Sequence, residues 1–314
     1  MKSIEKILYP CKFDQSMQPA EIVRAKGPDP RPLVVCLHTW SYDHNGPHKG
    51  YTELAELKNW HMIFPKFRGP NWLPEGCGSD LVVSDLEDAV AYMKSSVAVD
   101  PARIYLTGGS GGGHCSLLMA GRRPDLWTAV SAWCPISDIA RWHRESRDRG
   151  SAYADHIESA CGGNPAESEN ALKEARLRSP LTWLRNAAGY LPVDIGTGIH
   201  DGHTGSVPVG QAIRAYNLLA GQEDRISEED IAWIEENEKI PPHLAAKEGD
   251  PSYGSHTVYL RKQSHLVRLT IFEGGHDNLS ESAFDWLGRQ VSGQAPDWSA
   301  GTAVTSFGET ALSK

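Results

Sequence analysis

A serine surrounded by glycines is the feature of this sequence with the clearest chemical potential. Residues 107–115 read TGGSGGGHC, which places Ser110 among five glycines. Glycine destabilises the interior of helices and strands, yet this stretch lies between a strand-like run, RIYL, and a helix-like run, CSLLMAG. A flexible linker would be bordered by polar sequence. We therefore predict that a strand turns sharply into a helix here, in a turn too tight for side chains around Ser110.

A serine hydroxyl becomes a strong nucleophile only when a base removes its proton and an acid orients that base. In a strand-to-helix G-x-S-x-G turn, the acid and the histidine follow the serine in that order, each after a late strand. The run VDIGTGIHD ends in Asp201, and LTIFEGGH ends in His276. The sequence thus predicts a catalytic set of Ser110, Asp201 and His276. Asp138, which follows the strand-like AWCPI, is a rival for the acid.

The oxyanion formed during acyl transfer needs two N–H donors. One comes from the residue after the nucleophile and one from the loop after an early strand. The first donor is therefore predicted to be Gly111. The run LHTW, directly after the strand-like RPLVVC, assigns the second to the backbone N–H of Trp40.

These residues must be held by a scaffold, and short apolar runs alternate with amphipathic stretches along most of the chain. This alternation predicts an α/β fold with a mostly parallel central sheet flanked by helices. We expect one domain over residues 1–314, with a cap-like helical insertion at 138–190. An acidic helical insertion is expected at 226–248, and a loosely attached tail at 296–314.

Composition limits the classes of function. The formal net charge of −9 over 314 residues argues against nucleic-acid partners and against attraction to anionic membranes. The N-terminus has no signal-peptide pattern, which predicts a cytoplasmic protein or a secreted one whose signal was removed. The six cysteines and 13 histidines form no metal-binding pattern, so no metal or cofactor is expected. Cys36 and Cys134 fall in apolar runs and are predicted to be buried free thiols.

Several motifs together resemble one family. These are FRG, SDLEDAVAYM, VDPARIYLTGGSGGG, RSPLTWL, TGIHD followed by VPV, and EGGHD. Over residues 30 to 290 the chain resembles an α/β-hydrolase of the prolyl-oligopeptidase type. The resemblance implies the same triad. Thr39 stands where the family usually has glycine, and Trp40 stands where prolyl oligopeptidases place a tyrosine. The thirty residues before the first predicted core strand leave no room for the family's β-propeller, so we expect a catalytic domain without one.

The expected activity is hydrolysis of carboxylic esters through an acyl-enzyme. Two alternatives remain at this stage, a small serine peptidase and a hydrolase-fold binding protein with an inert site. Trp72 and Trp142 fall in segments expected near the mouth of the site, which predicts aryl or carbohydrate-linked esters, such as acetyl or feruloyl esters. Arg141 is a candidate for pairing with a substrate carboxylate. The expected partner is a small-molecule or oligosaccharide ester.

Overall fold

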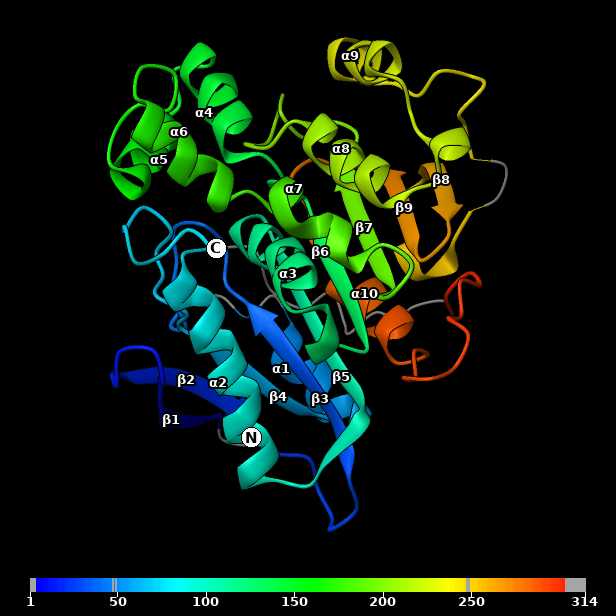
Figure 1. The fold of residues 1–314 in the computed structure, drawn as a ribbon. Coiled ribbons are helices and arrows are strands. Elements are labelled where there is room, and N and C mark those ends of the chain that lie inside the picture. Colours follow the sequence, from blue (N-terminus) through cyan, green and yellow to red (C-terminus); the bar gives the residue numbers. More distant parts are fainter. Residues whose placement is uncertain (1–3, 47, 49, 247–248, 303–314) are drawn as a thin grey trace, which may run out of the picture.

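A nine-stranded sheet forms the centre of the molecule (Figure 1). The computed structural model describes residues 4–46, 48, 50–246 and 249–302. The strand order is β1-β2-β4-β3-β5-β6-β7-β9-β8, with parallel pairing throughout the centre. The strands are β1 (Glu5–Pro10), β2 (Met17–Val23), β3 (Arg31–Leu37), β4 (His61–Pro65), β5 (Val99–Gly109), β6 (Ala129–Trp133), β7 (Val193–Gly198), β8 (Val258–Ser264) and β9 (Val267–Phe272).

Both faces of the sheet are covered, as the continuous apolar sequence of β3 requires. Successive side chains of a strand point to opposite faces. Leu33 and Val35 accordingly join the large apolar core beneath three helices, and Val34 and Cys36 join a second core under two others. The first face carries α2 (Asp80–Ser96), α3 (Gly111–Arg122) and α8 (Val209–Leu219), and the second carries α1 (Tyr51–Lys58) and α10 (Ser280–Leu287).

Antiparallel strands border the parallel centre on both sides. The hairpin of β1 and β2 extends one edge, and β8 pairs antiparallel with β9 at the other. The predicted fold class is thereby confirmed. The hairpin itself is a strand pair that the sequence pattern did not reveal, because β1 shows no alternation of polar and apolar residues and is largely exposed.

The segment expected to form a cap is helical. Figure 1 shows α4, α5 and α6 as a group set apart from the sheet. Their apolar side chains pack with Trp40 and Trp142 in a separate core. The elements of this segment are α4 (Ile139–Asp148), α5 (Tyr153–Cys161), α6 (Glu169–Leu177), α7 (Pro180–Trp183) and the 3-10 turn Leu184–Ala187. Another 3-10 turn, Pro124–Leu126, precedes β6 and lies outside the cap.

The later insertion contains α9 (Glu228–Asn237) and is flanked by the 3-10 turns Gln222–Asp224 and Pro251–Tyr253. Residues 297–302 differ from the expected loose tail because they pack against α10. The indole of Trp298 stacks on Trp286 at 5.3 Å, and the Gly301 N–H donates to Asp250. The rest of that tail lies outside the described residues.

All six cysteines are buried free thiols, as predicted for Cys36 and Cys134. Among the described residues, no helix is both long and apolar enough to cross a membrane.

Close packing of α3 against β3 leads to the first prediction. A Cβ at Gly112 would lie 2.5 Å from the backbone oxygen of Leu37 and 2.9 Å from that of His38. We expect Gly112→Ala to lower the free energy of unfolding by about 1–3 kcal/mol, because backbone atoms cannot swing aside. Chemical denaturation of the variant measures this loss.

Gly249→Ala is the matched control, since a Cβ there meets no atom within 4 Å. Its expected effect is below about 1 kcal/mol in either direction. Equal stability of Gly112→Ala and the wild type would contradict the packing described.

Candidate active site

Ser110 occupies a strained turn between β5 and α3. Its backbone has φ of 59° and ψ of −121°, a conformation that costs an L-residue free energy and is held only by surrounding contacts. The Ser110 N–H donates to the carbonyl of Trp133 at 2.9 Å. A Cβ on Gly108 would lie 2.7 Å from the carbonyl carbon of Gly112, so the strand and the helix can meet only at glycines. Ser110 is 9% exposed.

Asp201 and His276 meet across the loops that follow β7 and β9. Backbone hydrogen bonds join these loops, from the Ile199 N–H to Phe272 at 2.9 Å and from the His200 N–H to Gly274 at 3.0 Å. Nδ1 of His276 lies 2.7 Å from Oδ2 of Asp201, whose side chain is fully buried. Nε2 of His276 has no hydrogen-bond partner in the described part of the chain. The ring is therefore oriented through one nitrogen and free to exchange a proton at the other.

The loop after Asp201 closes back on the carboxylate. Oδ1 accepts hydrogen bonds from the N–H groups of Gly202 at 3.0 Å and Val207 at 3.1 Å. The rival acid, Asp138, instead caps α4 by accepting a hydrogen bond from the Arg141 N–H at 3.0 Å. Of the two candidate carboxylates, the one beside the histidine ring is Asp201.

The two predicted oxyanion donors lie side by side. A Cβ on Gly111 would be 2.5 Å from the backbone nitrogen of Trp40. Neither N–H donates to any group in the described residues. The Trp40 carbonyl accepts a hydrogen bond from the Asn71 N–H at 2.9 Å, which fixes the orientation of the peptide group that follows Trp40. The N–H group of Gly111, the residue after the serine, and that of the neighbouring Trp40 are thus both unpaired in the described part of the chain.

His38 supports the loop that carries Trp40. Its ring stacks on Phe67 at 3.9 Å, and its two nitrogens lie 2.8 Å from the carbonyls of Thr39 and Lys66. Burial lowers the pKa of His38 to about 4, so the ring is neutral near pH 7. It therefore acts as a packing and hydrogen-bonding group and adds no charge to the site.

The predicted substrate-contacting aromatics lie in the cap's own core. Trp142 packs edge-on against Trp40 at 4.8 Å and donates its indole N–H to Ser206 at 2.9 Å. It is only 1% exposed, so the expected direct contact with substrate is corrected to a packing role. Trp72 is partly buried against His156 at 4.8 Å. Within the described residues, the guanidinium of Arg141 forms no ion pair.

A thiol accompanies the acid and the histidine. Sγ of Cys134 lies with a carboxylate oxygen of Asp201 and a ring nitrogen of His276 in a group whose atoms are all within 4.8 Å of one another. It donates to the carbonyl of Asp277 at 3.2 Å. Burial, with the charge of Asp201, raises the pKa of this thiol well above its ordinary value. Because thiolates rather than thiols bind metals and attack carbonyls, Cys134 is poorly suited to either role.

Two supporting residues were missed by the sequence analysis. Arg149 donates to the carbonyls of Gly202 at 2.8 Å and Ser206 at 2.9 Å, which clamps the loop after Asp201. Asn278 packs against Gly109: a Cβ added to Gly109 would lie 3.0 Å from the Cβ of Asn278. Nothing in the sequence pattern of residues 138–150 singles out Arg149 for this role.

His200 links three segments around the acid. Nδ1 lies 2.7 Å from Glu238 at the end of α9, and Nε2 lies 3.1 Å from Glu273 after β9. These contacts raise the pKa of His200, with the hydrogen bond to Glu238 as the largest cause. Other titratable groups nearby are His203, whose Nδ1 is 3.8 Å from Glu238, and Tyr259, whose hydroxyl donates to Glu273.

Comparison with known proteins agrees with this architecture. The sequence model of the prolyl oligopeptidase family matches residues 78–231, a segment that contains Ser110 and Asp201. An acylaminoacyl peptidase of Pyrococcus horikoshii superposes with a TM-score of 0.61 at 16% identity, covering 95% of this chain and 44% of that one. A prolyl endopeptidase superposes with a TM-score of 0.55 at 20% identity, covering 69% of this chain and 31% of that one. A search of curated proteins finds no match.

Residues 78–231 match the model of the prolyl oligopeptidase family, and the chain has the α/β-hydrolase fold of the solved structures to which it is similar. It spans less than half the length of these solved structures.

The bridge formed by His200 predicts a pH-dependent contribution to stability. A histidine whose pKa is raised by folding stabilises the protein fully below its unfolded pKa, and this contribution is lost as the pH rises through the folded value. We expect His200→Gln to lower the free energy of unfolding at pH 6 by at most about 1 kcal/mol, because solvent screens partly exposed pairs. At pH 9 the two proteins should be equally stable.

A double-mutant cycle with Glu273→Gln, measured by urea unfolding at both pH values, isolates the coupling between the two side chains. Coupling that is unchanged from pH 6 to pH 9 would exclude an imidazolium bridge.

Proposed function

We propose that the protein hydrolyses carboxylic esters, with Ser110 as nucleophile, His276 as general base and Asp201 as the acid that orients it. The observation that carries the proposal is the 2.7 Å contact between Asp201 and Nδ1 of His276, with Nε2 left without a partner in the described residues. A neutral histidine held in this tautomer can accept a proton from a serine hydroxyl.

The reaction follows from these positions. Oγ of Ser110 attacks the acyl carbon while its proton passes to Nε2 of His276, and the carbonyl oxygen becomes an oxyanion. The unpaired N–H groups of Gly111 and Trp40 stabilise that charge. When the intermediate collapses, the imidazolium returns the proton to the departing alcohol and an acyl-enzyme remains. Water, deprotonated by the same imidazole, then releases the acid and restores the serine.

The preference for esters over amides rests on the size of the barrier. An amide carbonyl is stabilised by resonance and its amine leaves poorly, so its cleavage requires more stabilisation of the transition state. Here the ring of His38 faces two backbone carbonyls, and the indole of Trp40 is buried. Oxyanion stabilisation therefore depends on two backbone N–H groups. A small serine peptidase is the second candidate function, favoured by the family match and by the peptidases of similar fold.

The alcohol or acyl group is proposed to be aryl or carbohydrate-linked. Trp72 supports this proposal, because it is, with Tyr153, one of the partly exposed members of the aromatic cluster that begins at Trp40. Arg141, with no ion pair in the described residues, is free to meet an anionic substituent of such a substrate.

A matched pair of substrates tests the ester proposal. We expect an aryl ester to be hydrolysed with a kcat/KM at least about 100-fold above that of the anilide with the same acyl group, since the amide has the higher barrier and the same two N–H donors serve both transition states. Steady-state kinetics with p-nitrophenyl and p-nitroanilide derivatives give the ratio. Comparable values would favour the peptidase.

The assignment of the acid has its own test. Asp201→Asn is expected to lower kcat by about 10⁴-fold, because the amide imposes the wrong histidine tautomer. Asp138→Asn is the matched control and should retain activity, since asparagine also caps helices well. Loss of activity in the control with retention in Asp201→Asn would transfer the role to Asp138.

A further inference from the structure

The side chain of Trp142 on α4 contacts two loops of the active site at once. Its ring packs edge-on against the ring of Trp40 at 4.8 Å, and its indole N–H donates to the carbonyl of Ser206 at 2.9 Å. Trp40 belongs to the loop of residues 38–42, here called the oxyanion loop. Ser206 belongs to residues 202–207, the acid loop. One side chain of the cap therefore joins the two loops.

The acid loop lies directly against the acid and the base. A Cβ on Gly205, the residue before Ser206, would be 2.2 Å from Oδ1 of Asp201 and 2.7 Å from the Cβ of His276. The same carboxylate oxygen accepts a hydrogen bond from the Val207 N–H, the residue after Ser206. A displacement of the Ser206 carbonyl would therefore move the backbone that surrounds the carboxylate.

Two donors of the cap hold the Ser206 carbonyl. Besides the indole of Trp142, the guanidinium of Arg149 donates to this oxygen at 2.9 Å and to the carbonyl of Gly202 at 2.8 Å. The indole is buried, whereas Arg149 is exposed. Because a buried carbonyl that loses its donor finds no water in exchange, the indole is the stronger of the two anchors.

On the oxyanion loop, the same ring holds the residue that carries the second N–H donor. Trp40 is buried, and its ring contacts Trp142 more closely than it contacts His114 at 6.1 Å or Tyr153 at 6.4 Å. Its backbone nitrogen lies beside Gly111, which carries the first donor. A misplacement of about 1 Å can slow an enzyme about 100-fold. The position of Trp142 therefore bears on both halves of the site.

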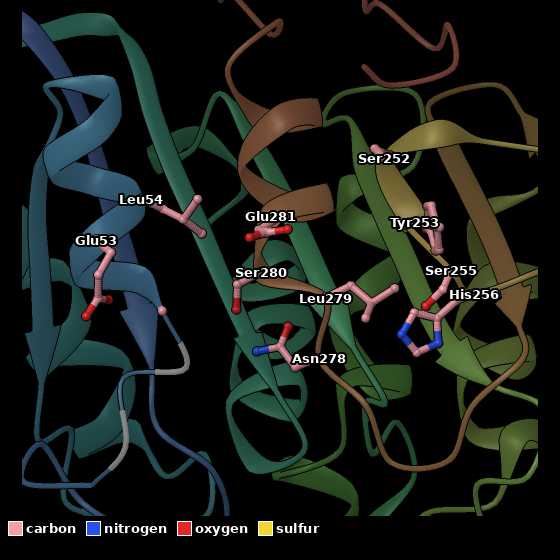
Figure 2. A pocket seen from close by; sticks show the side chains of 12 residues that line it. Glu53, Leu54, Ser252, Tyr253, Ser255, His256, Asn278, Leu279, Ser280 and Glu281 are labelled. Atoms are coloured by element: carbon pink, nitrogen blue, oxygen red, sulfur yellow. The ribbon is translucent and has the colours of Figure 1, made fainter. Parts of the chain in front are cut away.

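The loop that carries His276 is supported from elsewhere. Figure 2 shows Asn278 and Leu279 on one wall of a cavity of about 520 Å³, whose other walls are the first turn of α1 and residues 252–256. Asn278 also packs against the end of β5. The described residues that line this cavity include neither Ser110 nor any residue of the cap. Substitutions in the cap should therefore leave this support in place.

We propose that Trp142 is a positioning residue, which holds the acid loop and the oxyanion loop at the separation that catalysis needs. It acts through the Ser206 carbonyl and the ring of Trp40, without contact with the reacting atoms. The inference rests on the nucleophilic mechanism proposed above but not on its preference for esters. It makes the cap a part of the machinery that aligns the acid, the base and the oxyanion donors.

The rate at which a fluorophosphonate labels Ser110 tests this role, because the probe reports an activated serine whatever the substrate is. Trp142→Phe keeps a ring beside Trp40 and removes the N–H donor, so we expect labelling to slow about fivefold. Arg149→Met should slow it about threefold. The double variant should be slower by about 100-fold, more than the product of the two, because the carbonyl then has no donor from the cap.

Two substitutions elsewhere in the cap are matched controls. Trp183→Phe removes an indole N–H that donates to the carbonyl of Leu177 at 2.8 Å. Arg147→Met removes ion pairs with Asp155 and Glu158. Both variants should be labelled at the wild-type rate, since these bonds lie within the cap. Thermal unfolding shows that each variant is folded at the assay temperature.

Steady-state kinetics add a readout that a loss of stability does not mimic. With any ester that the wild type hydrolyses, Trp142→Phe should lower kcat and leave KM unchanged, because it alters alignment rather than substrate binding. If Trp142→Phe does not fold, the comparison of Arg149→Met with Arg147→Met decides, because Arg149 is exposed and holds the same carbonyl.

Three results would overturn the positioning role and leave the proposed hydrolysis intact. These are wild-type labelling of the double variant, independent effects of its two substitutions, and equal slowing in Trp183→Phe. If the wild type is labelled but hydrolyses no ester, the proposed function is wrong, and the labelling rates still decide the role of Trp142. A wild type whose Ser110 is not labelled would overturn both.

Discussion

The close approach of α3 to β3 is the constraint on which the site depends. Glycines at 108 and 112 allow the strand and the helix to meet within van der Waals distance of the backbone at Leu37. This packing holds Ser110 at a positive φ, a backbone conformation that the residue would avoid in an unfolded chain. It also brings the backbone of Gly111 against that of Trp40, so one contact sets both the nucleophile and the pair of oxyanion donors. The five glycines are therefore a packing requirement rather than a source of flexibility.

The acid and the base are positioned by a different device. Backbone hydrogen bonds join the loops after β7 and β9, and these bonds set the separation of Asp201 and His276 before any side chain contributes. The guanidinium of Arg149 and the ring of His200 then tie the acid loop to the cap and to α9. The cap thus has a structural role in the site, because Arg149 reaches the loop from the end of α4.

Much of this arrangement could be predicted from sequence because it depends on local patterns. Short stretches of sequence are enough to recognise the apolar run of β3, the glycine turn and the strand-end positions of Asp201 and His276. Together these features indicate the fold class. The contacts made by side chains between distant segments could not be predicted in this way. A tryptophan such as Trp142 is a side chain that often contacts substrates, but here it is buried against Trp40. The tail near Trp298 packs on Trp286 although its neighbours in sequence are polar. The roles of Arg149 and Asn278 depend on loop geometry that periodicity does not encode.

The central claim is that Ser110 is an activated nucleophile, and a covalent probe tests it most directly. A fluorophosphonate reacts with a serine only when a base removes its proton and an oxyanion site stabilises the adduct. The account predicts one adduct per chain, located by peptide mass spectrometry on Ser110, which forms at least about 100-fold more slowly when His276 is replaced by alanine. Absence of an adduct on folded protein, or an adduct on another serine, would contradict it.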